Sequence, residues 1–522
     1  MRVFGLNPIR WHAEDAPKGI QLEASELVEP IVIGLVASVL ILAGTLQKNS
    51  PFTSKIPGSW FIGVPSHPVP GNPLLEFLAR WLVYLGVALA CYVWVRLVGL
   101  VRKGYRISPR ALWSAFWTWI TPLMIAGPLF SRDVYSYAAQ GEMVARGIDP
   151  YSNGPIALGS NSYLATVDPF WVKAKAPYGP LFLYLDSLFV QFTDHNPLLT
   201  VLLLRLLALL GAVLIGKFSM RIATSLGKSP TLAFVLVALN PMVMYHFASA
   251  GHNDSIMTGL MLAGIAYFLE GRRIVGIVFC ALAAAVKIPA IVAVGFLGYN
   301  WIDVKPFRKR LRGAALAVII TVVVFGTLKI ISGLGWGWLL ALSTPGVVVT
   351  SVAPMVALAD LAHQITNVIN FGASFTTYVS IFRLVGVGIA GLIGLGLLLT
   401  SERKNLVRFI GITMVTVVVL GPVIQPWYIA WGLLVLACSP GKLTTWGTTV
   451  ISLGSIVLGI PGGPSIASWI LYLFVVSLAV VMLGARLPFS PSRLRRMSQR
   501  IVDDGVARVI HAVGLYRGAE PE

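Results

Sequence analysis

Residues 274–302 read IVGIVFCALAAAVKIPAIVAVGFLGYNWI, an almost unbroken apolar run of 29 residues. At about 1.5 Å per residue, this run is too long for one comfortable membrane crossing and short for two. The break Lys287-Ile288-Pro289 near its middle favours two helices joined by a turn. With a turn at this point, all the basic connections of the chain fall on one side of the membrane, so this stretch decides the topology.

The composition points to a membrane protein. Of the 522 residues, 56% are hydrophobic and only 12% are charged, and the mean hydropathy is +0.80. A soluble domain carries about twice that charged fraction, so a water-soluble globular protein is excluded. With about 20 apolar residues per crossing, we expect an all-α polytopic bundle of about 14 transmembrane helices. The apolar spans lie at 27–46, 74–100, 111–130, 197–216, 231–248, 255–269, 274–287, 289–302, 313–331, 378–399, 406–424, 427–440, 444–461 and 465–485.

Basic residues are concentrated in the short connections between these spans. In a soluble protein the formal net charge of +19 would suggest nucleic acid binding, but here the charges are topology signals and we expect no nucleic acid partner. By the positive-inside rule, the basic connections and both termini face the cytoplasm. The basic side carries Arg102, Lys103, Arg106, Arg110, Lys217, Arg221, Lys228, Arg272, Arg273, Lys305, Arg308, Lys309, Arg310, Arg312, Arg403, Lys404, Arg408 and the tail from Arg486.

The expected organisation is a cytoplasmic segment at 1–26, a transmembrane domain at 27–485 and a basic cytoplasmic tail at 486–522 that contacts anionic membrane lipids. Because the first segment is polar, we expect no cleavable signal peptide. Two long segments, 131–196 and 332–377, lie on the opposite, outer face, and the second contains no Lys or Arg. We therefore expect a multi-pass plasma-membrane protein whose site faces outward.

An acidic residue follows the third span. Asp133 comes just after the apolar run that ends at Phe130, in a segment rich in Tyr. Residues 134–146 have an apolar stripe and a polar face with Gln140 and Arg146, which predicts an amphipathic helix lying at the membrane surface. Asp133 could merely cap this helix, since Asp is a favoured N-cap residue. An acid directly after a membrane span also fits an ionisable group of a functional site.

A second outer motif, Ala176-Pro177-Tyr178-Gly179-Pro180-Leu181, opens an apolar stretch that runs to Phe192. Counting this stretch as a full crossing would invert every later loop. We therefore expect a juxtamembrane helix on the outer face, followed by a true span that starts near Pro197.

Histidines and cysteines give no metal-binding pattern. The fifth span ends in Tyr245-His246 and turns through Gly251-His252-Asn253-Asp254, which is either a polar turn between helices or part of a site. None of the seven histidines has a second histidine at ligand spacing. The three cysteines, Cys91, Cys280 and Cys438, lie inside apolar runs. We expect neither a metal site nor a disulfide.

Lys287 and Arg383 lie within apolar spans, near their outer ends. A cation inside the membrane costs roughly 3 kcal/mol, so each needs an acidic partner or an anionic ligand. Glu76 and Asp360 are candidate structural partners. The competing interpretation is a phosphate clamp, in which Lys287 supplies a point charge and Arg383 a two-pronged donor.

A proline-rich break interrupts a helical hairpin at the outer face. The motif is Gly421-Pro422-Val423-Ile424-Gln425-Pro426-Trp427-Tyr428-Ile429-Ala430-Trp431. Trp and Tyr are common at the depth of the membrane interface, so these aromatic residues alone indicate little. The two prolines with Gln425 between them are less routine, and they mark this break as part of a site.

In their order along the chain, these motifs resemble those of the GT-C glycosyltransferases. More narrowly, they resemble the actinobacterial polyprenol-phosphate-mannose-dependent α-(1→6)-mannosyltransferases that build lipomannan. The resemblance covers roughly residues 110–440 and rests on the acid after a span, Tyr-Gly-Pro-Leu, Gly-His-Asn-Asp, Lys-x-Pro and Gln-Pro-Trp-Tyr. The chain departs from many GT-C enzymes because Asp133 has no adjacent acidic partner and Asp-x-Asp is absent, which argues against a metal requirement.

The resemblance implies a GT-C type bundle, a reaction and a set of site residues. Mannose would pass from polyprenyl-phosphate-mannose, a substrate and no cofactor, to a glycolipid mannan acceptor, with Asp133 as general base on the sugar 6-hydroxyl. Lys287 and Arg383 would hold the phosphate. Because the family's donor is β-linked and its product α-linked, one inverting displacement suffices. The implied substrate-binding residues are Tyr135, Tyr137, Glu142, Tyr151, Tyr178, His252, Asn253, Asp254, Lys287, Arg383, Gln425, Trp427 and Tyr428.

Two other classes of protein share the composition. A flippase or transporter of lipid-linked sugars would also have many spans and interior cations, but its binding groups should lie near the bilayer midplane. A membrane scaffold or sensor would show no convergence of Asp, Lys and Arg on one side. Sugar transfer with and without Asp133 separates the three.

Overall fold

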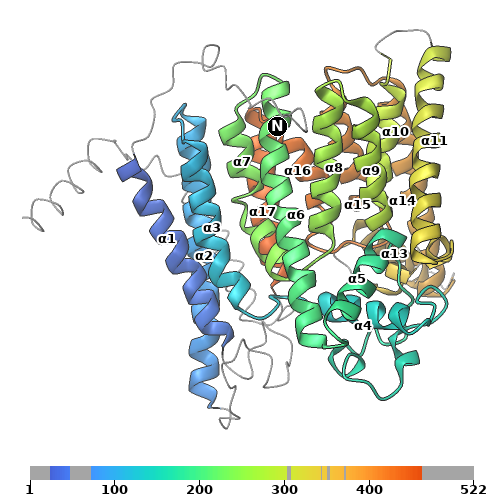
Figure 1. Cartoon of the computed structure of the whole chain (residues 1–522), viewed down its shortest axis with the longest axis horizontal. Coiled ribbons are helices and arrows are strands. Elements are labelled where there is room, and N and C mark those ends of the chain that lie inside the picture. The colour runs from blue at the N-terminus through green and yellow to red at the C-terminus, as the bar shows by residue number, and fades with distance from the viewer. Residues whose placement is uncertain are drawn as a thin grey trace, which may run out of the picture.

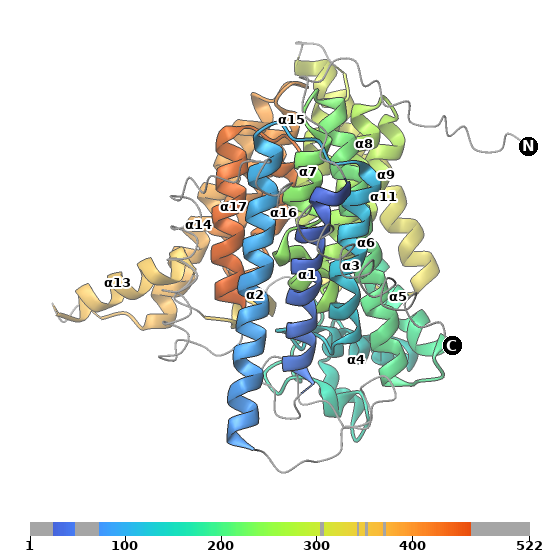
Figure 2. The same cartoon turned by 90° about the vertical axis from the view of Figure 1, so that its left-hand side faces the viewer.

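A computed structural model describes residues 24–46, 72–302, 307–341, 344–349, 353–368 and 372–460. Within these ranges the chain forms helices joined by turns, without strands. Most of the long helices run roughly side by side, as Figure 1 and Figure 2 show. The prediction of an all-α protein is confirmed for this part of the chain.

The N-terminal helices α1 (Ala24–Thr45), α2 (Pro73–Arg102) and α3 (Pro109–Ile125) lie at one side of the bundle (Figure 1), where α1 packs on both α2 and α3. Asn72 and Ser108 cap α2 and α3 by accepting backbone N–H bonds, and a proline follows each cap. Gly86 lets α2 approach α1 closely, because a Cβ there would lie 2.6 Å from the Ala37 carbonyl oxygen.

The segment after α3 forms a cap at one end of the bundle (Figure 1). It contains α4 (Asp133–Ala145), the short 3₁₀ turns η2 (Pro155–Leu158) and η3 (Leu164–Thr166), and α5 (Pro180–Phe192). The predicted helix is present as α4, but the protein itself buries every residue from 134 to 143. Of the expected polar face, Gln140 is buried and Arg146, just after the helix, is exposed. The helix predicted after Pro180 is present.

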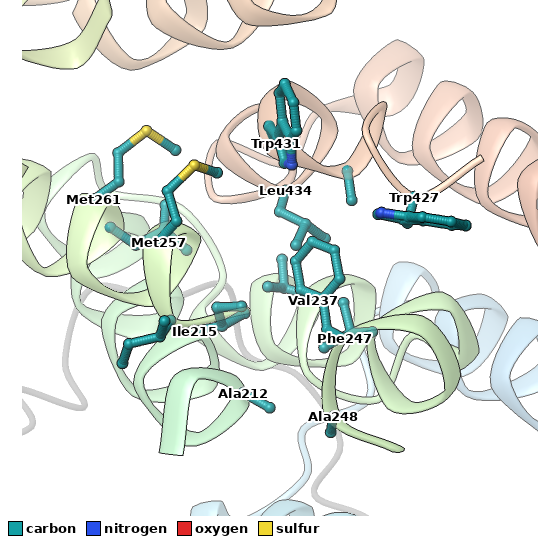
Figure 3. Packing of buried hydrophobic residues seen from close by; sticks show 14 of the residues in the cluster. Ala212, Ile215, Val237, Phe247, Ala248, Met257, Met261, Trp427, Trp431 and Leu434 are labelled. Carbon is teal, nitrogen blue, oxygen red and sulfur yellow. The ribbon is translucent and has the colours of Figure 1, made fainter. Parts of the chain in front are cut away.

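The central helices are α6 (Pro197–Ser225), α7 (Pro230–Val237), α8 (Asp254–Leu269), α9 (Arg273–Val286) and α10 (Ile291–Tyr299). The π-helix η4 (Val243–Ser249) follows α7, and the 3₁₀ turn η5 (Ile288–Ala290) joins α9 to α10. The turn predicted at Lys287 is confirmed, since this residue ends α9 in an extended conformation. Figure 3 shows side chains of α6, α7, η4, α8 and the segment that holds Trp427 and Trp431 meeting in one apolar cluster.

The C-terminal helices are α11 (Phe307–Ser332), α12 (Trp338–Ala341), α13 (Pro354–Val368), α14 (Phe375–Leu399), α15 (Leu406–Val419), α16 (Ala430–Ala437) and α17 (Lys442–Gly459), with the 3₁₀ turn η6 (Thr344–Val347) after α12. Figure 2 shows α13 projecting from the side of the bundle. Helices α11 and α14 expose many large apolar side chains, as expected of a surface that faces lipid.

Among the described residues, five helices are long and apolar enough to cross a membrane: Leu27–Thr45, Pro73–Arg102, Pro197–Ser225, Arg308–Ser332 and Phe375–Leu399. The predicted count of about 14 crossings is not confirmed. Several predicted spans form shorter helices because turns divide them, as when the 231–248 span splits into α7 and η4 beside Pro241. The span predicted at 465–485, most of the 1–26 segment and the 486–522 tail lie outside the described residues.

Several basic connections meet at the end of the bundle opposite α4 and α5 (Figure 1). Arg221, near the C-terminal end of α6, pairs with Glu270 at the end of α8. Arg403, between α14 and α15, donates to the Leu269 carbonyl oxygen at 3.2 Å. Basic residues from connections far apart in the sequence therefore lie together at one end of the folded bundle.

Candidate active site

A cavity of about 300 Å³ opens beside the first turn of α4. Five parts of the chain build it: α4, the segment before α5, the α9–α10 turn, the segment around η6 and the break before α16. The predicted residues that line it are Asp133, Tyr178, Lys287, Gln425, Trp427 and Tyr428.

Asp133 is the first residue of α4, and its side chain is about a quarter exposed. The N-cap residue is Arg132, without a side-chain cap bond, so Asp133 does not occupy the N-cap position itself. The chain reaches α4 through Phe130, whose φ of 63° is unusual for a bulky residue and makes the sharp turn from α3. The Asp133 carboxylate therefore faces the cavity, from which a substrate hydroxyl could approach it.

The side chain of His252 contacts the Asp133 carboxylate. Its Nε2 lies 3.5 Å from Asp133 Oδ2 and 2.9 Å from the Ser131 hydroxyl. Its Nδ1 donates to the His246 carbonyl oxygen, which fixes the orientation of the ring. The imidazole also stacks on Trp427, with ring centroids 4.2 Å apart. The ring is fully buried, so its orientation is set by these four contacts.

The π-helix that carries His246 is anchored to α3 and α6. Arg205 of α6 donates from Nε to the Ser249 carbonyl oxygen at 2.9 Å and from Nη2 to the Leu123 carbonyl oxygen at 3.0 Å. The Ser249 hydroxyl donates to the same Leu123 oxygen at 2.8 Å. π-Helical turns concentrate at functional sites, and this one places a histidine carbonyl under the site.

The electrostatic setting keeps Asp133 ionised. Burial by itself raises the pKa of the Asp133 carboxyl, but the hydrogen bond and charge of His252 outweigh it, with help from Lys287 and Ser131. The pKa therefore lies below its ordinary value. At neutral pH the group is a carboxylate, able to accept a hydrogen bond or a proton from a group in the cavity.

Lys287 pairs with Asp254, the first residue of α8, at 2.8 Å. Glu76 and Asp360, which the sequence offered as partners, were the wrong acids, because the break after α9 puts Lys287 next to the start of α8. The indole N–H of Trp431 donates to the same Asp254 oxygen at 2.5 Å. The Lys287 ammonium also lies 4.5 Å from the ring centre of Tyr428, a cation–π distance.

Arg383 does not line the cavity. Its Nη1 and Nη2 donate to the carbonyl oxygens of Gly346 and Val348, at 2.6 and 2.7 Å. The segment it holds contributes Thr344 and Val348 to the cavity wall. Among the described residues no acid forms an ion pair with Arg383, and these carbonyl oxygens accept its guanidinium hydrogen bonds.

The other predicted site residues lie outside the cavity lining. Glu142 is buried and bonded to Arg146 at 2.6 Å and to His195 at 2.6 Å, which makes it part of a structural pair network. Tyr135, Tyr137, Tyr151 and Asn253 are buried in the core, where a sugar ring could not stack on them. Tyr137 packs edge-on against Tyr178 at 5.0 Å and so supports a ring that does line the cavity.

Sequence reasoning missed several lining residues: Ser136, Gln140, Trp171, Lys175 and Trp431. Ser136 and Gln140 follow Asp133 by three and seven residues, so helical spacing could have placed all three on one face. Trp171 and Lys175 lie in an irregular segment with no periodicity, and only the fold brings them to the cavity.

The described residues contain no group of three His, Cys, Asp or Glu side chains arranged to hold a metal ion. Asp133 and His252 lie close together, but no third side chain of this kind among the described residues joins them to form a metal-binding group.

A helical bundle with long apolar helices, and with an acid, a cation and aromatic rings around a cavity at one end, defines a membrane protein with a polar, aromatic-lined site. The chain belongs to the α-(1→6)-mannopyranosyltransferase family. The family's N-terminal domain model matches residues 31–303, and the MptB C-terminal domain model matches residues 355–487. The chain is accordingly a glycosyltransferase.

Curated relatives agree with this assignment. The chain is 32% identical over 423 residues to α-(1→6)-mannopyranosyltransferase A of Mycobacterium tuberculosis, covering 78% of this chain and 80% of the relative. It is 28% identical over 428 residues to α-(1→6)-mannopyranosyltransferase B of Corynebacterium glutamicum, covering 73% and 71%. A probable α-(1→6)-mannopyranosyltransferase of Mycolicibacterium smegmatis is 27% identical over 508 residues, 88% of each chain. No solved structure matches the chain.

Proposed function

We propose that the protein transfers mannose from polyprenyl-phosphate-mannose to the 6-hydroxyl of a lipomannan-type glycolipid acceptor, forming an α-(1→6) linkage. The observation that carries this proposal is the Asp133 carboxylate, held by His252 and open to a cavity that Lys287 also lines. Names of the relatives support mannose as the sugar and the α-(1→6) linkage. A lipid-linked donor fits a cavity built inside a bundle of apolar helices.

The reaction needs one displacement. The acceptor oxygen forms a bond to the anomeric carbon while the bond from that carbon to the phosphate oxygen breaks, and polyprenyl phosphate leaves. The acceptor proton passes to Asp133, and the ring of His252 keeps the carboxylate in place. A β-linked donor then gives an α-linked product without a covalent enzyme intermediate.

The aromatic lining supplies the surface for the sugar rings. Trp171, Tyr178, Trp427, Tyr428 and Trp431 all contribute to the cavity wall. Rings of this kind offer large rigid apolar faces at small entropic cost. Trp427 is itself fixed by the stacked His252, so the ring that contacts substrate and the ring that orients the base belong to one unit.

We place the cavity on the extracytoplasmic face of the plasma membrane and both termini in the cytoplasm. The support is the clustering of Arg221, Arg403 and their neighbours at the end of the bundle away from α4 (Figure 1). The same location disfavours a flippase or transporter, whose binding groups should lie near the middle of the bundle.

Lys175 is expected to help bind the donor phosphate. It lines the cavity, has an exposed side chain and forms no ion pair with a described residue, whereas Lys287 is already paired with Asp254. Loss of one charge-assisted bond costs about 1.5–3 kcal/mol, or roughly tenfold or more in affinity. We expect Lys175→Gln to raise the donor KM by about tenfold.

The matched control is Lys173→Gln, two residues away in the same segment, exposed and not part of the cavity lining. Its donor KM should stay within about twofold of wild type, since an exposed charge outside the site is screened. Equal effects of the two substitutions would show that Lys175 acts only through the general charge of the surface.

Transfer should be independent of divalent metal ions. A phosphodiester brings its own leaving group, and the cations of the site are side chains. We expect full activity of the purified protein in EDTA. Loss of activity in EDTA that manganese or magnesium restores would contradict this, and would direct attention to Asp254 as a ligand.

The direct test of the proposed function uses purified protein in liposomes with radiolabelled mannose. We expect transfer to a mannoside acceptor from polyprenyl-phosphate-mannose and none from GDP-mannose. Transfer from the nucleotide sugar alone, or movement of the lipid-linked sugar between leaflets without transfer, would refute the proposal.

A further inference from the structure

Two polar side chains of α4 face the cavity without protein partners. Ser136 and Gln140 are 6% and 5% exposed, and both line the cavity. The Ser136 hydroxyl oxygen and the Gln140 Oε1 atom have no hydrogen-bond partner in the described structure. Buried polar atoms are almost always bonded, so unpaired atoms at the wall of a cavity indicate a ligand that bonds them.

The positions of these residues relate them to Asp133. Residues 133, 136 and 140 are separated by three and four positions, which puts them on one face of α4. At about 1.5 Å per residue, the row extends roughly 10 Å along the helix axis from Asp133. A base at one end of a row of hydrogen-bonding groups is suited to a ligand that has many hydroxyls, one of which reacts.

Five aromatic rings line the same cavity. Trp171 and Tyr178 come from the segment before α5, Trp427 and Tyr428 come from the break before α16, and Trp431 lies in the first turn of α16. A polar row in a cavity lined by aromatic rings matches a pyranose, which has apolar faces and a rim of hydroxyls. A lipid chain has no polar atoms to bond these side chains, and a phosphodiester, which only accepts hydrogen bonds, would leave the carbonyl oxygen of the Gln140 amide unbonded.

We propose that Ser136 and Gln140 bind hydroxyls of the terminal sugar of the acceptor and set its register against Asp133. This inference rests on the proposed function, and it deepens that function by naming residues that select the acceptor. The acceptor, and not the donor mannose, is assigned to the row because the row begins at Asp133, the group that takes the acceptor's proton.

The test is a kinetic comparison of Gln140→Leu, Gln140→Glu and Ser136→Ala with wild type. The substrates are an alkyl mannoside and deoxy analogues that each lack one hydroxyl other than the reacting 6-hydroxyl. For wild type, kcat/KM should be about tenfold lower with at least one deoxy analogue, because the missing hydroxyl leaves a buried protein group unpaired. Gln140→Leu should raise the acceptor KM by about tenfold, leave the donor KM unchanged and no longer discriminate against that analogue.

The matched control is Gln191→Leu, an exposed glutamine on α5 outside the cavity lining, which should behave as wild type. A rise in the donor KM with an unchanged acceptor KM would overturn the assignment to the acceptor. A fall in melting temperature with normal KM values and unchanged discrimination would reduce Gln140 to a packing residue. If wild type itself fails to transfer mannose, the proposed function fails instead, so the two failures are distinguishable.

Discussion

Asp133→Asn should lower kcat by about 10²- to 10⁴-fold, the usual contribution of a general base, while the melting temperature stays close to that of wild type. The amide has nearly the same shape and can still accept a hydrogen bond from the Ser131–His252 pair, but it cannot take a proton at neutral pH. The carboxylate is a quarter exposed and is not an N-cap, so little of the fold depends on its charge.

Asp149→Asn is the matched control for this substitution. Asp149 is an exposed acid of the same outer segment, outside the cavity lining, and it closes a turn by accepting from the Tyr151 backbone N–H at 2.9 Å. Asn closes such turns equally well, so this variant should transfer normally. Activity of Asp133→Asn above about a tenth of wild type would remove Asp133 from the role of base.

The pH dependence of transfer follows from the same carboxylate. Because the pKa of Asp133 is held below its ordinary value, the base is ionised at neutral pH and across mildly acidic pH. Its contribution is present above that pKa and disappears as pH falls through it. Acid inactivation that begins near neutral pH would therefore need a different group.

We expect the second largest effect from Lys287→Met, which should abolish mannose transfer and also lower the stability of the protein. The substitution leaves the Asp254 carboxylate buried without its cation, and breaking one side of a buried pair costs about 3–5 kcal/mol of unfolding free energy. The double variant Lys287→Met/Asp254→Asn removes both charges and should recover most of the melting temperature. It should not recover transfer, because the leaving phosphate still lacks the Lys287 ammonium and is faced by Lys175 alone.

Arg383→Lys separates a phosphate contact from a structural one. Arg383 donates to two carbonyl oxygens of the segment that forms part of the cavity wall, and a lysine cannot reproduce both bonds. We expect a lower melting temperature with an unchanged donor KM. If the Lys287/Asp254 double variant regained transfer and Arg383→Lys raised the donor KM, the phosphate would belong to Arg383.

The parts of the site that the sequence revealed are departures from the apolar pattern. Asp133, Lys287 and the proline break around Gln425 stand out because charge, cations and helix breaks are costly inside a membrane bundle. Such a cost can be recognised without knowing any contact. The turn at Lys287 was predictable for the same reason, since a single long helix would have placed basic connections on both sides.

The parts that the sequence did not reveal depend on contacts between distant segments. Lys287 and Asp254 are 33 positions apart, and nothing local says that their ends of α9 and α8 meet. The environment of α4 was misjudged because its polar face could look toward water or toward an interior cavity, and both give the same pattern. The same ambiguity concealed Ser136 and Gln140.

The most direct measurement is a structure of the protein in lipid with a non-transferable phosphonate analogue of polyprenyl-phosphate-mannose. The proposal predicts the sugar among Trp427, Tyr428 and Tyr178, with the phosphonate beside Lys287 or Lys175 and the face of the anomeric carbon opposite the phosphonate open toward Asp133. Analogue density at the middle of the bundle, or a sugar with no path from Asp133 to that face, would contradict it.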